Sequence, residues 1–180
     1  MRVIAGALKG RRLSCPSGSA VRPTTDKVKE AMFGAIQFQI AGAAVLDAFA
    51  GSGALGIEAL SRGAAHVDFA ECEKACQKTL EANLQSLNTS GFRVLKGDVL
   101  HLIPQLGCYD IVLIDPPYDE GLYEPLLNAL RDAGKLNNGA VLVAECRRKF
   151  DFMIPIGYNL TKRKDYGDIS LAFLKYGVEK

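Results

Sequence analysis

The sequence lacks long hydrophobic runs, which argues against a membrane-spanning protein. Its longest apolar stretches are only a few residues, such as Ile111 to Ile114, far short of the roughly 20 residues that span a bilayer. The opening Met1 to Gly6 contains no apolar run of the length found in signal peptides. We therefore expect a cytoplasmic protein with no membrane partner. With 180 residues, 48% of them apolar and 23% charged, the chain suits one domain with a substantial core.

The chain is also poor in metal ligands. It has only two histidines, His66 and His101, and its cysteines form no Cys-x-x-Cys pair. Cys72 and Cys76 lie one helical turn apart, but with only two histidines in the chain a zinc site lacks obvious partners. We predict no metal site, and we expect five reduced cysteines that pack as small apolar side chains: Cys15, Cys72, Cys76, Cys108 and Cys146.

Charge of both signs is present but is unevenly distributed. Residues 1–30 carry seven Lys/Arg against two Asp/Glu, and residues 145–180 carry eight against five. Residues 31–144 carry seven against thirteen, so two basic ends flank an acidic middle although the net charge is only +2. This pattern favours a polyanion-binding surface assembled from the two ends of the chain. The candidate contacts with RNA phosphates are Lys9, Arg11, Arg12, Arg22, Arg147, Arg148, Arg163 and Lys164.

Two elements are predicted before the main pattern begins. Residues 1–24 form a basic N-terminal arm or a small hairpin, because two short apolar pieces flank their glycines. Apolar residues from Val28 to Ile40 follow the spacing of an amphipathic helix, with Thr24 or Thr25 as its N-cap.

From residue 43 onward, predicted strands and helices alternate. The strands are 44–48, 66–70, 92–95, 109–114 and 140–145, the helices are 54–62, 73–87 and 123–133, and 99–106 is a short helix or turn. This alternation implies a parallel sheet with helices on both faces. Residues 158–164 and 169–175 predict a terminal hairpin. The expected class is α/β, with a mostly parallel seven-stranded sheet, an antiparallel C-terminal hairpin and a single domain over 25–180.

The first candidate site is the segment Asp47-Ala48-Phe49-Ala50-Gly51-Ser52-Gly53-Ala54-Leu55-Gly56, which begins at the end of a predicted strand. Its glycines allow a sharp turn and the close approach of a ligand. Glu71 ends the next strand, where a carboxylate can accept hydrogen bonds from both ribose hydroxyls. The spacing also fits G-x-G-x-x-G, so an NAD-dependent oxidoreductase is an alternative. Asp47 argues against it, because a carboxylate repels a pyrophosphate and attracts a cationic ligand such as S-adenosylmethionine.

Two further candidate sites follow the next predicted strands. Asp98, in Lys96-Gly97-Asp98-Val99, can accept a hydrogen bond from an adenine amino group or cap a helix. In Asp115-Pro116-Pro117-Tyr118 the prolines lack N–H donors, so the Asp115 carboxylate and the Pro116 carbonyl can both accept from an exocyclic amine. Tyr118 offers a flat face on which a base can stack. This pattern predicts methyl transfer to a base amine, achieved by positioning without a metal or a covalent nucleophile.

These motifs resemble class I (Rossmann-like) methyltransferases with an Asp-Pro-Pro-Tyr motif, and the chain as a whole resembles the RsmD family of bacterial 16S ribosomal RNA guanine-N(2) methyltransferases. The resemblance covers Arg2 to Gly6, Lys9 to Leu13, Leu46 to Gly56, Asp115 to Tyr118, the strand ending at Glu145, and Tyr166 to Asp168. Its most specific part is Arg22 to Phe33. There Lys27 and Lys29 replace the arginines usual in the family, which keeps the charge without bidentate phosphate contacts.

The resemblance implies a monomeric enzyme that uses S-adenosylmethionine, leaves S-adenosylhomocysteine, and methylates the 2-amino group of one guanine in 16S rRNA or the assembling small ribosomal subunit. That guanine must be unpaired or flipped out of its helix. The implied cofactor-binding residues are Asp47, Phe49, Gly51, Ser52, Gly53, Glu71, Asp98, Val99 and Thr24, and the implied catalytic residues are Asp115, Pro116, Pro117 and Tyr118.

Three other functions fit parts of the pattern. An adenine-amine methyltransferase acting on DNA or RNA shares Asp115 to Tyr118, but 180 residues leave little room for a separate sequence-reading domain. Methyltransferases that act on glutamine amides usually have asparagine at the position of Asp115. A non-catalytic ribosome-binding protein with the same fold would not need to keep the glycine-rich turn intact.

Overall fold

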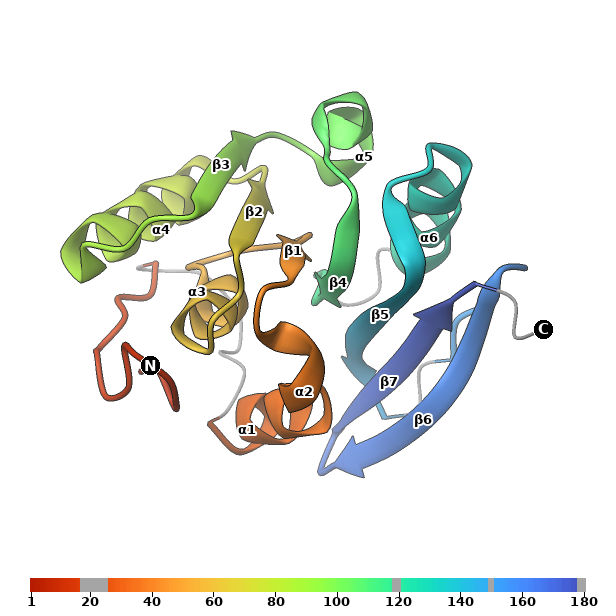
Figure 1. Cartoon of the computed structure of the whole chain (residues 1–180), viewed down its shortest axis with the longest axis horizontal. Coiled ribbons are helices and arrows are strands. Elements are labelled where there is room, and N and C mark those ends of the chain that lie inside the picture. Colours follow the sequence, from red (N-terminus) through yellow and green to blue (C-terminus); the bar gives the residue numbers. More distant parts are fainter. Residues whose placement is uncertain (17–25, 118–120, 149–150, 178–180) are drawn as a thin grey trace.

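The computed structural model describes residues 1–16, 26–117, 121–148 and 151–177. A seven-stranded sheet runs through it in the order β3-β2-β1-β4-β5-β7-β6 (Figure 1). The strands are β1 (Ala44–Asp47), β2 (His66–Glu71), β3 (Phe92–Lys96), β4 (Tyr109–Ile114), β5 (Leu136–Arg147), β6 (Tyr158–Tyr166) and β7 (Ile169–Tyr176). β1 to β5 are parallel, and β7 is antiparallel to both β5 and β6. The prediction of a mostly parallel sheet with an antiparallel C-terminal hairpin is confirmed.

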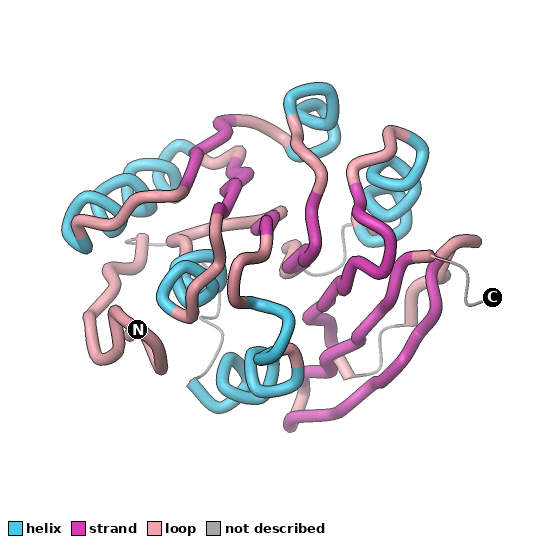
Figure 2. Tube along the Cα trace, viewed as in Figure 1, coloured by secondary structure: helices cyan, strands magenta, loops and turns pink. Residues whose placement is uncertain are grey.

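Helices cover both faces of this sheet (Figures 1 and 2). They are α1 (Asp26–Ala35), α2 (Gln37–Ile40), α3 (Ala54–Ser61), α4 (Lys74–Leu87), α5 (Val99–Leu102) and α6 (Tyr123–Asp132), with a 3-10 turn, η1, over Ile103–Gln105. Successive strand residues enter opposite cores. In β1, Val45 joins the core that includes side chains of α1 to α4, whereas Leu46 joins the core of α5 and α6. Because the central strands are buried on both faces, they read as almost continuous apolar runs. Within the described ranges, no helix has the length and apolar character needed to cross a membrane.

The structure differs from the predicted elements at two places. The single helix expected up to Ile40 is two helices, because Ile36 leaves the helical conformation with φ −112° and ψ 13°. Apolar spacing reports only which residues face the core, and Ile36 remains buried there, so the spacing does not reveal the break. β5 begins at Leu136, earlier than expected, and its register with β4 shifts between Tyr109 and Ile111. The sequence pattern did not predict this start of the strand, because the residues that follow Leu136 are polar.

The N-terminal segment, residues 1–14, packs against α3. A single antiparallel bridge joins Arg2 to Arg12, and the amide of Val3 donates to the carbonyl of Arg11 at 2.9 Å. Val3 and Leu13 are both buried in the core that includes α3. The part of this segment that carries Lys9, Arg11 and Arg12 is here called the basic tip. Its backbone is therefore anchored on both sides.

Candidate active site

Four candidate segments meet at the carboxyl edge of the sheet. β3, β2, β1 and β4 are neighbours in that order and are parallel. Asp98 follows β3, and Glu71 ends β2. Residues 48–53, here called the glycine turn, follow β1, and Asp115 follows β4. Residues far apart in the sequence thus come together at the edge where open α/β sheets bind ligands.

The glycines of this region serve two different purposes. Gly51 and Gly53 both have positive φ, 55° and 85°. A Cβ on Gly53 would lie 2.4 Å from Leu80 of α4, and one on Gly56 would lie 2.2 Å from the ring of Phe69. These two glycines allow close packing of the protein itself. A Cβ on Gly51 would meet no atom within 4 Å, so this is the glycine with open space beside it.

Asp47 lies inward of the turn. It is 1% exposed, and its Oδ2 accepts a hydrogen bond from the amide of Gly56 at 2.8 Å. Burial raises the pKa of Asp47 to about 7, the hydrogen bond from Gly56 opposes this shift, and the Glu71 carboxylate adds to it. Asp47 therefore holds the first turn of α3. Its carboxylate lies beneath the glycine turn, with its burial only partly offset by the hydrogen bond from Gly56.

Glu71 binds the turn from the neighbouring strand. Its Oε2 accepts from the amide of Gly51 at 2.6 Å, and its Oε1 accepts from the amide of Glu73 at 2.7 Å. Each carboxylate oxygen can accept a second hydrogen bond. The geometry thus fixes the Glu71 carboxylate beside Gly51 and leaves it the capacity to accept from ligand hydroxyls.

The remaining cofactor candidates surround these two acids. Asp98 caps α5 by accepting from the amide of Leu100 at 2.8 Å, and about half of its side chain is exposed. Val99 is buried beneath this cap, and Phe49 is half-buried against the core of α5 and α6. Thr24 lies outside the described residues.

The catalytic candidates leave β4 beside the glycine turn. Asp47 and Leu113 are register partners, so the chain departs from β1 and β4 at neighbouring points. Asp115 is half-buried, Pro116 is buried and Pro117 is exposed. Tyr118 lies outside the described residues. The turn and the Asp115–Pro117 segment therefore flank one stretch of the sheet edge.

Two basic groups were expected to contact RNA, and they differ in their surroundings. Lys9, Arg11 and Arg12 are exposed at the tip of the N-terminal segment, and none of them forms an ion pair with a carboxylate in the described part of the chain.

The C-terminal group is exposed too, but salt bridges engage part of it. Arg148 pairs with Asp165 at 3.0 Å, and Arg163 pairs with Asp151 at 2.9 Å. Lys164 lies 5.5 Å from the ring centre of Tyr166, and Arg147 is exposed at the end of β5. Arg22 lies outside the described residues.

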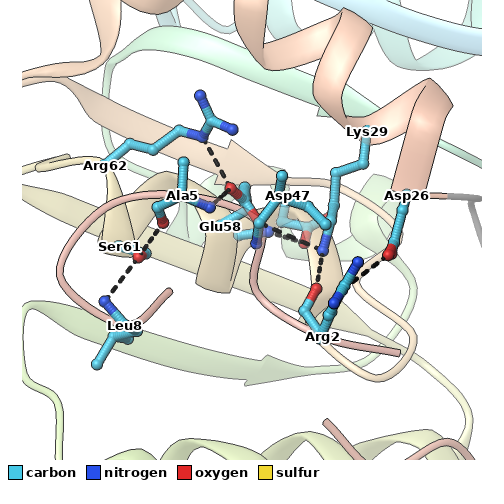
Figure 3. A network of polar contacts seen from close by, with 11 residues as sticks. Arg2, Ala5, Leu8, Asp26, Lys29, Asp47, Glu58, Ser61 and Arg62 are labelled. Carbon is cyan, nitrogen blue, oxygen red and sulfur yellow. Dashed lines mark hydrogen bonds and ion pairs between the residues drawn. The ribbon is translucent and has the colours of Figure 1, made fainter. Parts of the chain in front are cut away.

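Sequence reasoning missed a buried charge cluster centred on Glu58. Lys29 and Glu58 are fully buried and form an ion pair at 3.3 Å, and Arg62 donates to Glu58 at 2.8 Å (Figure 3). Lys29, which stands where the family usually has arginine, therefore contributes to the interior and not to phosphate binding. A lone acid in the apolar run Ala-Leu-Gly-Ile-Glu-Ala-Leu was the available signal, because a buried charge needs a partner.

Comparison with known proteins agrees with this architecture. The sequence model of the family described as "Conserved hypothetical protein 95" matches residues 1–175. Ribosomal RNA small subunit methyltransferase D of Escherichia coli strain K12 is 37% identical over 172 residues, which cover 94% of this chain and 87% of that protein. The chain belongs to the RsmD family.

Solved structures place this RsmD-family chain among the methyltransferases. The protein yhhF from Escherichia coli, 35% identical, superposes with a TM-score of 0.89 over 99% of both chains. A precorrin-6y C5,15-methyltransferase from Geobacter metallireducens, only 13% identical, shares the fold with a TM-score of 0.70 over 92% of this chain and 94% of its own. The predicted Rossmann-like methyltransferase class is confirmed, which removes the support for an NAD-dependent oxidoreductase.

Proposed function

We propose that this chain transfers a methyl group from S-adenosylmethionine to the exocyclic 2-amino group of one guanine in 16S rRNA. The adjacency of β1 and β4 carries the proposal, because it sets the glycine turn beside the Asp115–Pro117 segment. One segment suits a cofactor and the other suits a planar base with an amine. The Escherichia coli relative is named for methylation of small-subunit ribosomal RNA, which favours that RNA as the substrate.

The residues at the turn fit this cofactor. It carries cationic ammonium and sulfonium groups together with two ribose hydroxyls, and it supplies an electrophilic methyl group when bound. Asp47 and Glu71 provide a negative local field, and the Glu71 carboxylate is held where it can accept from hydroxyls. Asp98 is available for an adenine amino group. The open side of Gly51 lets a ligand approach the backbone closely.

The Asp115–Pro117 segment fits the acceptor base. A guanine 2-amino group has two N–H donors, and the Asp115 carboxylate and the Pro116 carbonyl are the matching acceptors. Holding both hydrogens turns the nitrogen lone pair away from the ring, and the carboxylate stabilises the positive charge that develops on the nitrogen. Tyr118 is assigned to stacking on the base. The exposed cations of the N-terminal and C-terminal groups would hold the surrounding RNA by its phosphates.

The decisive experiment is mass-spectrometric mapping of modified nucleosides. Small ribosomal subunits and free 16S rRNA, both from cells without this activity, are incubated with the protein and S-adenosylmethionine. We expect N2-methylguanosine at a single position. N6-methyladenosine would instead establish the adenine-amine alternative, and the absence of any new methylated nucleoside would overturn the proposal.

A substitution at Asp115 tests the base side separately. Asp115→Ala should lower transfer by about 100-fold or more while binding of S-adenosylhomocysteine, measured by calorimetry, stays within about threefold of wild type. Asp132→Ala, at the exposed end of α6, removes a carboxylate far from the sheet edge and serves as the control. Full activity of Asp115→Ala would refute this residue's assignment.

A further inference from the structure

Asn83 of α4 connects the N-terminal segment to the glycine turn. Its side-chain oxygen accepts from the amide of Ser14 at 2.9 Å, and its side-chain nitrogen donates to the carbonyl of Ser14 at 3.1 Å. The same nitrogen donates to the carbonyl of Ser52 at 2.9 Å. Asn83 is 3% exposed. One buried amide group therefore holds backbone groups of two segments that are 38 positions apart in the sequence.

A second residue of α4 supports the same turn. Leu80 lies one helical turn before Asn83, and its methyl group occupies the space where a Cβ of Gly53 would be. Leu80 contacts the turn by packing, and Asn83 contacts it by a hydrogen bond. The position of Ser52 and Gly53 therefore depends directly on α4.

The N-terminal segment has an independent second anchor on α3 (Figure 3). Glu58 accepts from the amides of Ile4 and Ala5 at 2.8 and 3.0 Å. The Ser61 hydroxyl donates to the carbonyl of Ala5 and accepts from the amide of Leu8 at 2.9 Å. This α3 anchor holds the basic tip without contacting the glycine turn, whereas Asn83 contacts both the N-terminal segment and the turn.

We propose that Asn83 is a positioning residue that sets the cofactor-binding turn relative to the RNA-binding N-terminal segment. The inference rests on the proposed function, since it assigns these two roles to the two segments. Loss of the Asn83 amide leaves the Ser52 carbonyl without its side-chain donor and releases Ser14, so both binding sites lose a fixed backbone. Loss of the Ser61 hydroxyl loosens the N-terminal segment alone.

The test compares three substitutions by two binding measurements. Asn83→Asp keeps the acceptor for Ser14 but sets a carboxylate against two carbonyls, so it should weaken both S-adenosylhomocysteine and 16S rRNA binding by about tenfold. Ser61→Ala should weaken rRNA binding by about threefold or more and leave S-adenosylhomocysteine binding unchanged. Thr79→Ala is the matched control, because this hydroxyl of α4 donates to the carbonyl of Ala75 in the same helix and not to Asn83.

A measurement on the wild-type protein avoids any effect of substitution on folding. S-adenosylhomocysteine should slow hydrogen exchange of the Ser14 amide, because that amide and the turn share Asn83. Unchanged Ser14 exchange on binding, or wild-type affinity for both ligands in folded Asn83→Asp, would overturn the inference alone. A wild-type protein that binds S-adenosylhomocysteine but not rRNA would overturn the proposed function instead.

Discussion

Asp47 and Asp68 are buried aspartates on neighbouring strands, β1 and β2, with opposite electrostatic environments. Asp68 accepts two hydrogen bonds from Arg93, at 2.9 and 2.7 Å, and one from the hydroxyl of Tyr109 at 2.5 Å. Its Oδ1 also lies at hydrogen-bond distance, 2.9 Å, from Nε2 of His66. Burial alone would raise the pKa of Asp68, but the hydrogen bonds from these three residues bring it below its ordinary value. The protein's own donors thus satisfy this carboxylate fully.

The carboxylate charge of Asp47 is stabilised much less by hydrogen-bond donors than that of Asp68. It accepts from the amide of Gly56, and burial with the nearby Glu71 carboxylate raises its pKa to about 7. The contrast separates an acid that the protein's own donors stabilise from one that we propose for cofactor binding. Asp68 stabilises the sheet through cationic and phenolic donors, whereas Asp47 costs stability when ionised, and the proposed cationic cofactor would offset that cost.

The largest effect is expected from Asp68→Ala. Removing the carboxylate leaves the buried hydroxyl of Tyr109 and the guanidinium of Arg93 without their acceptor, so the free energy of unfolding should fall by about 3–5 kcal/mol in urea titrations. Asp68→Asn, which keeps one acceptor oxygen, should lose less. Equal stability of wild type and Asp68→Ala would show that the contacts of Asp68 with Arg93, Tyr109 and His66 do not stabilise the fold.

Asp47→Asn should have its main effect on the cofactor. Loss of the negative charge should weaken S-adenosylmethionine binding by about 10- to 100-fold, the range of one partly screened charge interaction. The free energy of unfolding near pH 7.5 should not decrease, because a buried ionised group has been removed. A variant that is less stable yet binds the cofactor normally would reverse the contrast with Asp68.

The two aspartates should also respond to pH in opposite directions. The raised pKa of Asp47 means that its stabilising contribution is complete below its ordinary value of 3.8 and is lost as the pH rises toward about 7. The advantage of Asp47→Asn over wild type should therefore grow by about 3–4 kcal/mol between pH 4 and 7.5 in urea titrations. The lowered pKa of Asp68 means that its contribution is present above 3.8 and is lost as the pH falls through its folded value. An Asp47→Asn advantage that does not change with pH would contradict the raised pKa.

The smallest effect is expected from Arg93→Lys. The guanidinium contacts both oxygens of Asp68, but about half of its side chain is exposed. Lysine keeps the charge but loses the bidentate contact with the carboxylate, so the free energy of unfolding should fall by about 1 kcal/mol. If Arg93→Lys lowered the free energy of unfolding as much as Asp68→Ala does, the whole stabilising effect of Asp68 would come from its pair with Arg93.

Much of the candidate site was predictable because its signals are local. Asp47, the glycines, Glu71, Asp98 and Asp115 each follow or end a predicted strand, and the carboxyl ends of parallel strands share an edge. Local patterns could not distinguish the glycine with open space, Gly51, from those required for packing, Gly53 and Gly56. That distinction depends on Leu80 and Phe69, which approach from other elements.

The sequence by itself determined the α/β alternation, the edge at which the site lies and the chemical groups present there, because each depends on residue type and near-neighbour spacing. Only the tertiary structure decided that Lys29 is buried against Glu58, that Asp47 faces α3, and that Asn83 binds both Ser14 and Ser52. These contacts join residues between 9 and 69 positions apart. Burial and hydrogen-bond partners at such separations depend on how the helices pack on the sheet, which no local pattern specifies.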